Sequence, residues 1–216
     1  FHLAERGERQ IVFVTGEPGI GTTTIVDLFL NRVRAMGLIR IGHGHCLEHY
    51  GKGEAYLPIL DALVRLCRGP GGSRLVGLLS RYAPTWLMQM PALLSDEEFA
   101  TLQNRSQGTT LQRMLREMAE ALEVFTAERP LILVLEDLHW SDDSTVALLT
   151  ALAQRQERAQ LLVLGTYRPS DLASEHPLRT LKQELQLRNR WKELPLNLLT
   201  EQEVTTYVTG QFPEHP

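Results

Sequence analysis

The stretch Phe13-Val14-Thr15-Gly16-Glu17-Pro18-Gly19-Ile20-Gly21-Thr22-Thr23-Thr24 decides the fold that this sequence predicts. An apolar run, Ile11 to Val14, leads into it, and a segment with helical periodicity, Ile25 to Val33, follows it. Glycines let the backbone of such a turn wrap around a phosphate chain with its N–H groups pointing inward. The new helix adds the positive end of its dipole. The order of strand, glycine-rich turn and helix therefore predicts a phosphate-binding loop.

The turn follows the P-loop pattern G-x-x-x-x-G-K-[ST] except at the lysine, where Thr22 stands. The other specified positions match, so we prefer this interpretation to a plain glycine turn. We expect the backbone N–H groups of this loop to hold the β-phosphate, Thr23 to offer its hydroxyl to Mg²⁺, and Thr24 to reach the α-phosphate side. The predicted nucleotide-binding residues are Gly16, Glu17, Pro18, Gly19, Ile20, Gly21, Thr22, Thr23 and Thr24.

Composition excludes several classes of protein. The chain has 216 residues, of which 43% are hydrophobic, enough for one large α/β domain, or one domain plus a small appendage, with a packed core. Its net charge of −4 predicts no direct binding of nucleic acid. No run approaches the roughly 18 apolar residues of a membrane span, and no signal-peptide pattern is present. We expect a cytoplasmic protein whose two cysteines, Cys46 and Cys67, are reduced.

Segments with strand and helix patterns alternate along the chain. This alternation predicts an α/β fold, a doubly wound parallel sheet with helices on both faces. We expect the first nine residues, which are polar, to lead in from another segment, and short helical pieces between Ser73 and Asn104 to be broken at Pro84 and Pro91. The predicted strands are Gln10–Thr15, Leu38–His45, Leu131–Glu136, Leu161–Tyr167 and Trp191–Leu196. The longer predicted helices are Thr23–Met36, Tyr56–Cys67, Thr109–Thr126, one capped by Ser141, His176–Leu187, and Glu201–Gln211, capped by Thr200.

Two adjacent acids, Glu136 and Asp137, end the uninterrupted apolar run Leu131 to Leu135. The carboxyl ends of parallel strands are where ligands bind in open α/β sheets. Carboxylates there hold Mg²⁺ and orient an attacking water. By position we assign the Mg²⁺ role to Glu136 and the water-polarising, catalytic role to Asp137, and the reverse order remains open. The alternative is a solvated acidic turn.

Arg168 follows the apolar strand that ends near Thr166. An arginine at this edge is a candidate catalytic residue that senses the γ-phosphate and links its presence to a change of domain position. A surface arginine before Pro169 is the alternative interpretation.

Histidines cluster at the end of the second predicted strand. His43 and His45 lie on one face of that strand and are close in sequence to Cys46 and His49. His43 and His45 could both reach a metal ion, but the spacing of the cluster matches no zinc pattern. We therefore interpret the cluster as the histidine-rich end of a strand.

The motifs together resemble a known family. Thr15 to Thr24 resembles the Walker A motif of signal-transduction ATPases with numerous domains (STAND), a branch close to the AAA+ ATPases. Leu133 to Asp142 is similar to their Walker B motif, and Leu164 to Arg168 to their first sensor. Cys46 to Gly51 and Glu54 to Pro58 resemble the bacterial AAA-type ATPase domain with origin-recognition-like character, which is found in large transcriptional regulators and in regulators fused to nucleotide cyclases.

The resemblance implies a five-stranded sheet in the order 5-1-4-3-2, with the sensor strand between the P-loop strand and the Walker B strand. It implies ATP and Mg²⁺ as cofactors, and slow hydrolysis used as a switch. It also implies that residues 1–216 are a single P-loop domain, with a helical insertion at about 56–127, cut from a larger multidomain protein. The implied partners are ATP or ADP, a helical lid, sensor and output domains of the same chain, and further copies in a nucleotide-dependent oligomer.

Two functional hypotheses follow. The first is an ATP-binding switch module of a signal-transduction or transcriptional regulator, an ATPase by resemblance whose hydrolysis is impaired because Thr22 replaces the lysine. The second is a P-loop scaffold for protein interaction that does not use nucleotide. A metabolic kinase is disfavoured, because the sequence contains no substrate-binding motif.

Overall fold

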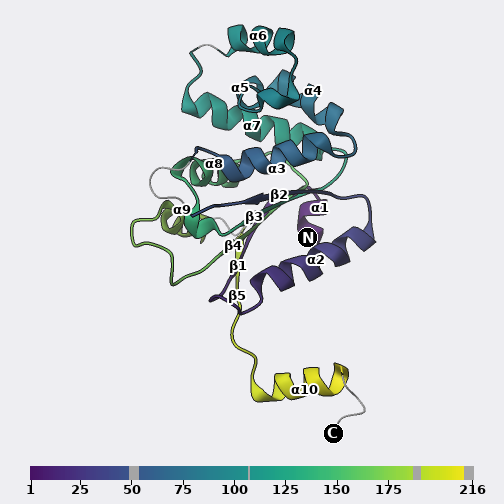
Figure 1. Cartoon of the computed structure of the whole chain (residues 1–216), viewed down its shortest axis with the longest axis vertical. Coiled ribbons are helices and arrows are strands. Elements are labelled where there is room, and N and C mark those ends of the chain that lie inside the picture. Colours follow the sequence, from purple (N-terminus) through teal and green to yellow (C-terminus); the bar gives the residue numbers. More distant parts are fainter. Residues whose placement is uncertain (49–53, 107, 187–190, 212–216) are drawn as a thin grey trace.

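A computed structural model describes residues 1–48, 54–106, 108–186 and 191–211 of the chain. Five strands form one parallel sheet in the order β2-β3-β4-β1-β5, so β4 lies between β1 and β3 (Figure 1). Read from the opposite edge, this is the predicted order, which is confirmed. The strands are β1 (Gln10–Thr15), β2 (Arg40–His45), β3 (Leu131–Glu136), β4 (Leu161–Tyr167) and β5 (Trp191–Pro195).

Residues along the central strand β3 alternate between two hydrophobic cores. Leu131, Leu133 and Leu135 belong to one core, and Ile132 and Val134 belong to the other. All six residues of β3 are buried, as expected for a strand covered on both faces. The period-2 pattern of the strands therefore places a layer of helices on each side of the sheet.

Helices cover the two faces unequally (Figure 1). On one face lie α1 (His2–Glu5) and α2 (Thr22–Met36), which share a core with Val14, Ile132 and Leu164. On the other side of the sheet, the helices that follow β2, β3 and β4 form more than one layer. These are α3 (Leu57–Arg68), α4 (Gly72–Tyr82), α5 (Pro84–Leu87), η1 (Pro91–Leu93), α6 (Asp96–Arg105), α7 (Leu111–Thr126), η2 (Leu138–Trp140), α8 (Asp143–Gln154) and α9 (Pro177–Gln186). Among them, α3 lies next to β2, and α6 lies farthest from the sheet.

Proline and capping signals in the sequence match most element boundaries. Pro84 and Pro91 begin α5 and η1, in agreement with the expected breaks. The last helix, α10 (Glu201–Gln211), is capped by Thr200, whose Oγ1 accepts from the Glu203 N–H at 3.3 Å. Within the part of the chain that the structure describes, no helix combines the length and the apolar character needed to cross a membrane.

Two expectations about local structure were wrong. The cap of α8 is Asp142, whose Oδ1 accepts from the Thr145 N–H at 2.9 Å, whereas the Ser141 hydroxyl donates to the Leu138 carbonyl at 2.7 Å. Ser141 is thus used by the preceding 3-10 turn and is not available to cap the helix. The first nine residues are also more than a polar lead-in, since Ala4 and Arg9 are buried in the domain.

Strand β2 carries Gly42 and Gly44 on the face that α3 covers, and His43 and His45 on the opposite face. A Cβ added to Gly44 would lie 1.9 Å from the carbonyl oxygen of Pro58 and 2.7 Å from its carbonyl carbon. The backbone of α3 thus approaches the strand as closely as glycine allows. This contact holds α3 against the sheet and leaves the opposite face of β2 to His43 and His45.

Gly44→Ala is expected to destabilise the chain by about 1–3 kcal/mol, because the clash is with backbone and relief requires α3 to shift. Urea unfolding measures the change in free energy. Gly77→Ala is the matched control, since Gly77 is exposed on α4 and an added Cβ meets nothing within 4 Å. It should be neutral or stabilising by up to about 1 kcal/mol. Equal stabilities of the two variants would show that α3 does not pack as described.

Candidate functional site

The glycines of the loop between β1 and α2 have distinct roles. Gly19 and Gly21 adopt φ values of 81° and 103°, in the left-handed region that favours glycine. Gly16 is needed for space, because a Cβ there would lie 2.4 Å from the Ile20 Cγ2 atom. The local sequence therefore dictates the loop conformation, as a phosphate-binding loop requires.

The N-terminus of α2 is open to a ligand. Its N-cap, Gly21, provides no side-chain hydrogen bond, and the first turn contains no acidic residue. Thr23 and Thr24, in that first turn, are exposed. Since the first N–H groups of a helix have no partner within it, this end offers donors and a positive dipole to an anion.

A hollow of about 320 Å³ lies in front of the loop, at the carboxyl edge of the sheet. It is lined by the loop from Glu17 to Thr24 except Ile20, by Asp137 after β3, and by Thr166, Tyr167 and Arg168 at the end of β4. The structure thus gathers the predicted residues Thr23, Asp137 and Arg168, together with most of the predicted loop residues, around one space. Gly16, Ile20 and Glu136 are predicted site residues that do not line it.

Asp137 reaches the hollow because the chain turns sharply after β3. Its φ of 57° is in the left-handed region, which aspartate tolerates better than most residues. Its N–H donates to the Thr166 Oγ1 at 3.0 Å. This bond joins the end of β3 to the end of β4 and holds Asp137 beside the loop.

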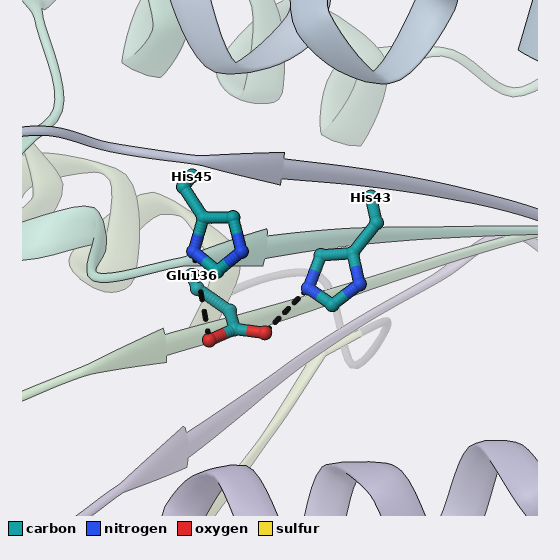
Figure 2. Close-up of side chains that lie close together, drawn as sticks. All are labelled: His43, His45 and Glu136. Atoms are coloured by element: carbon teal, nitrogen blue, oxygen red, sulfur yellow. Dashed lines mark hydrogen bonds and ion pairs between the residues drawn. The ribbon is translucent and has the colours of Figure 1, made fainter. Parts of the chain in front are cut away.

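Glu136 points elsewhere, toward two histidines of β2 (Figure 2). The His43 Nε2 donates a hydrogen bond to its Oε1, and the His45 Nδ1 lies 3.7 Å from its Oε2. The hydrogen bond from His43, together with the electrostatic interaction with His43 and His45, lowers the pKa of Glu136 despite its burial. The sequence left open which of the two acids takes the Mg²⁺ role. Because Asp137 lines the hollow and Glu136 does not, this placement favours the reverse of the first assignment, with Asp137 in the Mg²⁺ role.

Arg168 is the sole basic residue among the described residues that line the hollow, where Glu17 and Asp137 contribute two carboxylates. Its Nη1 lies 3.3 Å from the Asp171 Oδ2, and its side chain is 38% exposed. The Arg168 N–H donates to the Nδ1 of His139, at 3.4 Å. The hollow therefore has an excess of negative charge for a site that would receive an anion.

Two polar residues of the site, Thr166 and Ser170, were not among the residues predicted from the sequence. Thr166 positions Asp137, and its signal was a hydroxyl at the end of an otherwise apolar strand. Ser170 donates from its Oγ to the Glu17 Oε2 at 2.6 Å, and so connects the segment after β4 to the phosphate loop. No sequence pattern indicated that contact, because the two residues are 153 positions apart.

The histidine cluster also differs from expectation. His43 and His45 do share a face, but the third member of their group is Glu136, from the neighbouring strand. Cys46 is buried, and burial raises the pKa of its thiol to about 12, so it is protonated at neutral pH. His49 lies outside the described residues.

Comparison with known proteins places these features in a family. The chain is 24% identical over 96% of its length to an uncharacterised protein of Rhizobium meliloti (strain 1021), and spans 22% of that protein. The structure of a STAND protein with a tetratricopeptide repeat sensor, from Pyrococcus horikoshii, aligns with the whole chain at a TM-score of 0.46 and 16% identity, and the chain covers 25% of it. Drosophila ORC bound to DNA aligns with 94% of the chain at a TM-score of 0.41 and 12% identity, over 90% of its own chain.

The family model for the AAA ATPase domain matches residues 1–164, which include β1, the glycine-rich loop, β3 and the acidic pair. These are the elements on which the sequence analysis based its prediction. The chain therefore belongs to the AAA ATPase domain family.

Proposed function

We propose that this domain is an ATP-binding switch module of a signal-transduction or transcriptional regulator, and that its hydrolysis of ATP is impaired. The observation that carries the proposal is the single hollow formed by the phosphate loop, Asp137 and Arg168, in which Thr22 occupies the position of the P-loop lysine. Membership of the AAA ATPase domain family supports nucleotide as the ligand. The larger regulator and its helical lid, sensor and output domains are part of the proposal, as is a nucleotide-dependent oligomer.

The residues around the hollow fit a nucleotide with Mg²⁺. A threonine hydroxyl and a carboxylate, from Thr23 and Asp137, are hard oxygen ligands of the kind that Mg²⁺ prefers. The open end of α2 supplies N–H groups for phosphate oxygens. We therefore assign the Mg²⁺ side of the site to Thr23 and Asp137, with Thr166 as the residue that positions Asp137. Bound Mg²⁺ would neutralise phosphate charge.

The charge of the hollow explains why we propose weak binding and slow hydrolysis. Two carboxylates face one guanidinium, and the lysine that would balance them is absent. The loop amides and the helix end remain, and they hold the phosphates that ADP and ATP share. Charge that develops on the transferred phosphoryl group has less compensation here than in a P-loop with lysine. A domain that holds nucleotide without turning it over quickly has the properties of a switch.

Arg168 and Asp171 provide a means of sensing the γ-phosphate. The two side chains pair at 3.3 Å, and the neighbouring Ser170 is bonded to Glu17 of the loop. A phosphate that draws Arg168 away from Asp171 would disturb a segment attached to both β4 and the loop. This exchange of partners is the switching movement that we propose.

A scaffold that does not use nucleotide is the second candidate, and Thr22 is the observation that favours it. Calorimetry with ATP and Mg²⁺ separates the two. For the switch we expect saturable, Mg²⁺-dependent binding, weakened about tenfold or more by Asp137→Asn, at 1.4 kcal/mol per factor of ten. Asp143→Asn is the matched control, because Asp143 is exposed in the first turn of α8 and does not line the hollow. Absence of binding at millimolar ATP would rule out the switch and favour the scaffold that does not use nucleotide.

Glu136→Gln decides between the two acids in the same titration. If it weakens Mg²⁺-dependent binding more than Asp137→Asn does, then Glu136 leaves the histidines when nucleotide binds and takes the Mg²⁺ role. If Asp137→Asn has the larger effect, the assignment made from the geometry holds.

A further inference from the structure

We propose that His43, His45 and Glu136 form a binding site for Zn²⁺ between β2 and β3. One ligand atom from each of the three residues lies within 4.8 Å of the other two (Figure 2). The proposal concerns a different ion and a different space from the nucleotide site, since none of the three residues lines the hollow in front of the phosphate loop. It does not depend on whether the domain binds ATP.

The topology of the sheet brings the three side chains together. His43 and His45 are two residues apart on β2 and point to the same face. Glu136 is the register partner of His45 across the parallel pair, so it points to that face as well. The two imidazole rings are stacked, with centroids 5.0 Å apart and an interplanar angle of 18°. Figure 2 shows both rings directed toward the carboxylate between them.

Packing on the opposite face of the sheet holds His43, His45 and Glu136 in this arrangement. Gly42 and Gly44 occupy the opposite face of β2, where α3 lies against the strand and prevents it from moving in that direction. Glu136 ends a strand that is buried throughout, and its own side chain is only 10% exposed. Two of the three ligands thus come from one rigid strand and the third from its paired neighbour, as a preorganised metal site requires.

The chemistry of these ligands matches zinc. Two imidazole nitrogens and one carboxylate oxygen are the ligand set of open zinc sites, with bonds of about 2.0–2.2 Å. The His43 Nε2 and the Glu136 Oε1 are already in contact, and the His45 Nδ1 is 3.7 Å from the Oε2, so small side-chain rotations bring all three to one ion. Mg²⁺ and Ca²⁺ prefer sites made wholly of oxygen ligands, and this one has two nitrogens.

The site is also accessible. The side chains of His43 and His45 are 29% and 44% exposed, so an ion can enter from solvent and a water can complete its coordination. Cys46, although adjacent, belongs to the core on the other side of the sheet. A bound ion would fix Glu136 against β2, one residue before Asp137, and so would attach the carboxyl end of β3 to the edge strand.

Calorimetric titration of the full chain with Zn²⁺ alone, after treatment with a chelator and without nucleotide, tests the proposal. We expect one ion to bind per chain. Removing a residue that only hydrogen-bonds to a metal ligand lowers metal affinity roughly tenfold to hundredfold, and removing a ligand itself should lower the affinity for Zn²⁺ at least as much. His43→Gln, His45→Gln and Glu136→Gln should therefore each weaken binding more than tenfold. Co²⁺ in place of Zn²⁺ should give visible absorption bands that each variant loses.

His2→Gln is the matched control, because the His2 Nδ1 also pairs with a glutamate, Glu5, at 2.9 Å, but on the exposed surface of α1. It should leave Zn²⁺ binding unchanged. The thermal midpoint of each variant in the presence of chelator shows whether it is folded. The exposed His45 is the position least able to disturb the fold, so its variant keeps the test valid if the others unfold. No saturable binding by the original chain, or equal losses in His45→Gln and His2→Gln, would overturn the proposal.

Discussion

Thr22→Lys is expected to strengthen the binding of ATP about tenfold or more, because the new ammonium group would enter a hollow that now contains two carboxylates and one guanidinium. A hydrogen bond to a charged group contributes about 1.5–3 kcal/mol. Lysine in this loop reaches the β- and γ-phosphates, so ADP should gain less than ATP does. Hydrolysis should gain most, since the added charge compensates the phosphoryl group during transfer.

Side-by-side titrations and phosphate-release assays of the two proteins measure these differences. Thr22→Met is the matched control, because methionine lengthens the side chain without adding a charge, and it should not improve ATP binding. If the original chain binds ATP tightly and hydrolyses it as well as Thr22→Lys does, another cation performs the function of the lysine. Arg168, the basic residue found at the hollow, would then be the first to replace, by Arg168→Ala.

Glu123→Gln is expected to destabilise the chain by about 3 kcal/mol, because it leaves a buried arginine without its counter-charge. Arg9 is 3% exposed, and its Nη2 donates to the Glu123 Oε1 at 3.0 Å. Arg155 donates to both oxygens of the same carboxylate, at 2.9 and 2.8 Å. Burial lowers the pKa of Arg9, and the hydrogen bond to Glu123 opposes that shift, so the carboxylate is what keeps the buried guanidinium stable.

Urea unfolding measures this loss, which should appear as a lower midpoint with an unchanged slope. Glu120→Gln is the matched control on the same helix, α7. Glu120 pairs with Arg116 at 3.8 Å, and both side chains are exposed, so the loss there should be at most about 0.5 kcal/mol. Similar effects of the two substitutions would show that the interaction of Arg9 with Glu123 is screened by solvent.

The sequence by itself determined the elements that depend on local physics. Uninterrupted apolar runs predicted β3 and β4, because a strand buried on both faces cannot carry polar residues in its interior. The glycines at 16, 19 and 21 predicted the loop, since its conformation requires positive φ at two of them and an absent Cβ at the third. The order of the sheet came from the family resemblance, and from no local signal.

Tertiary structure alone decided which side chains meet. The period of a strand places His43 and His45 on one face, but only the pairing of β2 with β3 brings Glu136 to them, from 93 residues away. The same pairing draws Glu136 away from the hollow, while the left-handed turn at Asp137 and its bond to Thr166 keep Asp137 beside it. Arg9 can likewise be buried only because the fold places Glu123 beside it, where the carboxylate balances its charge. Local propensities depend on residues close in sequence. A buried charge must be paired with an opposite charge, and the residue that pairs with it can lie far away in the sequence.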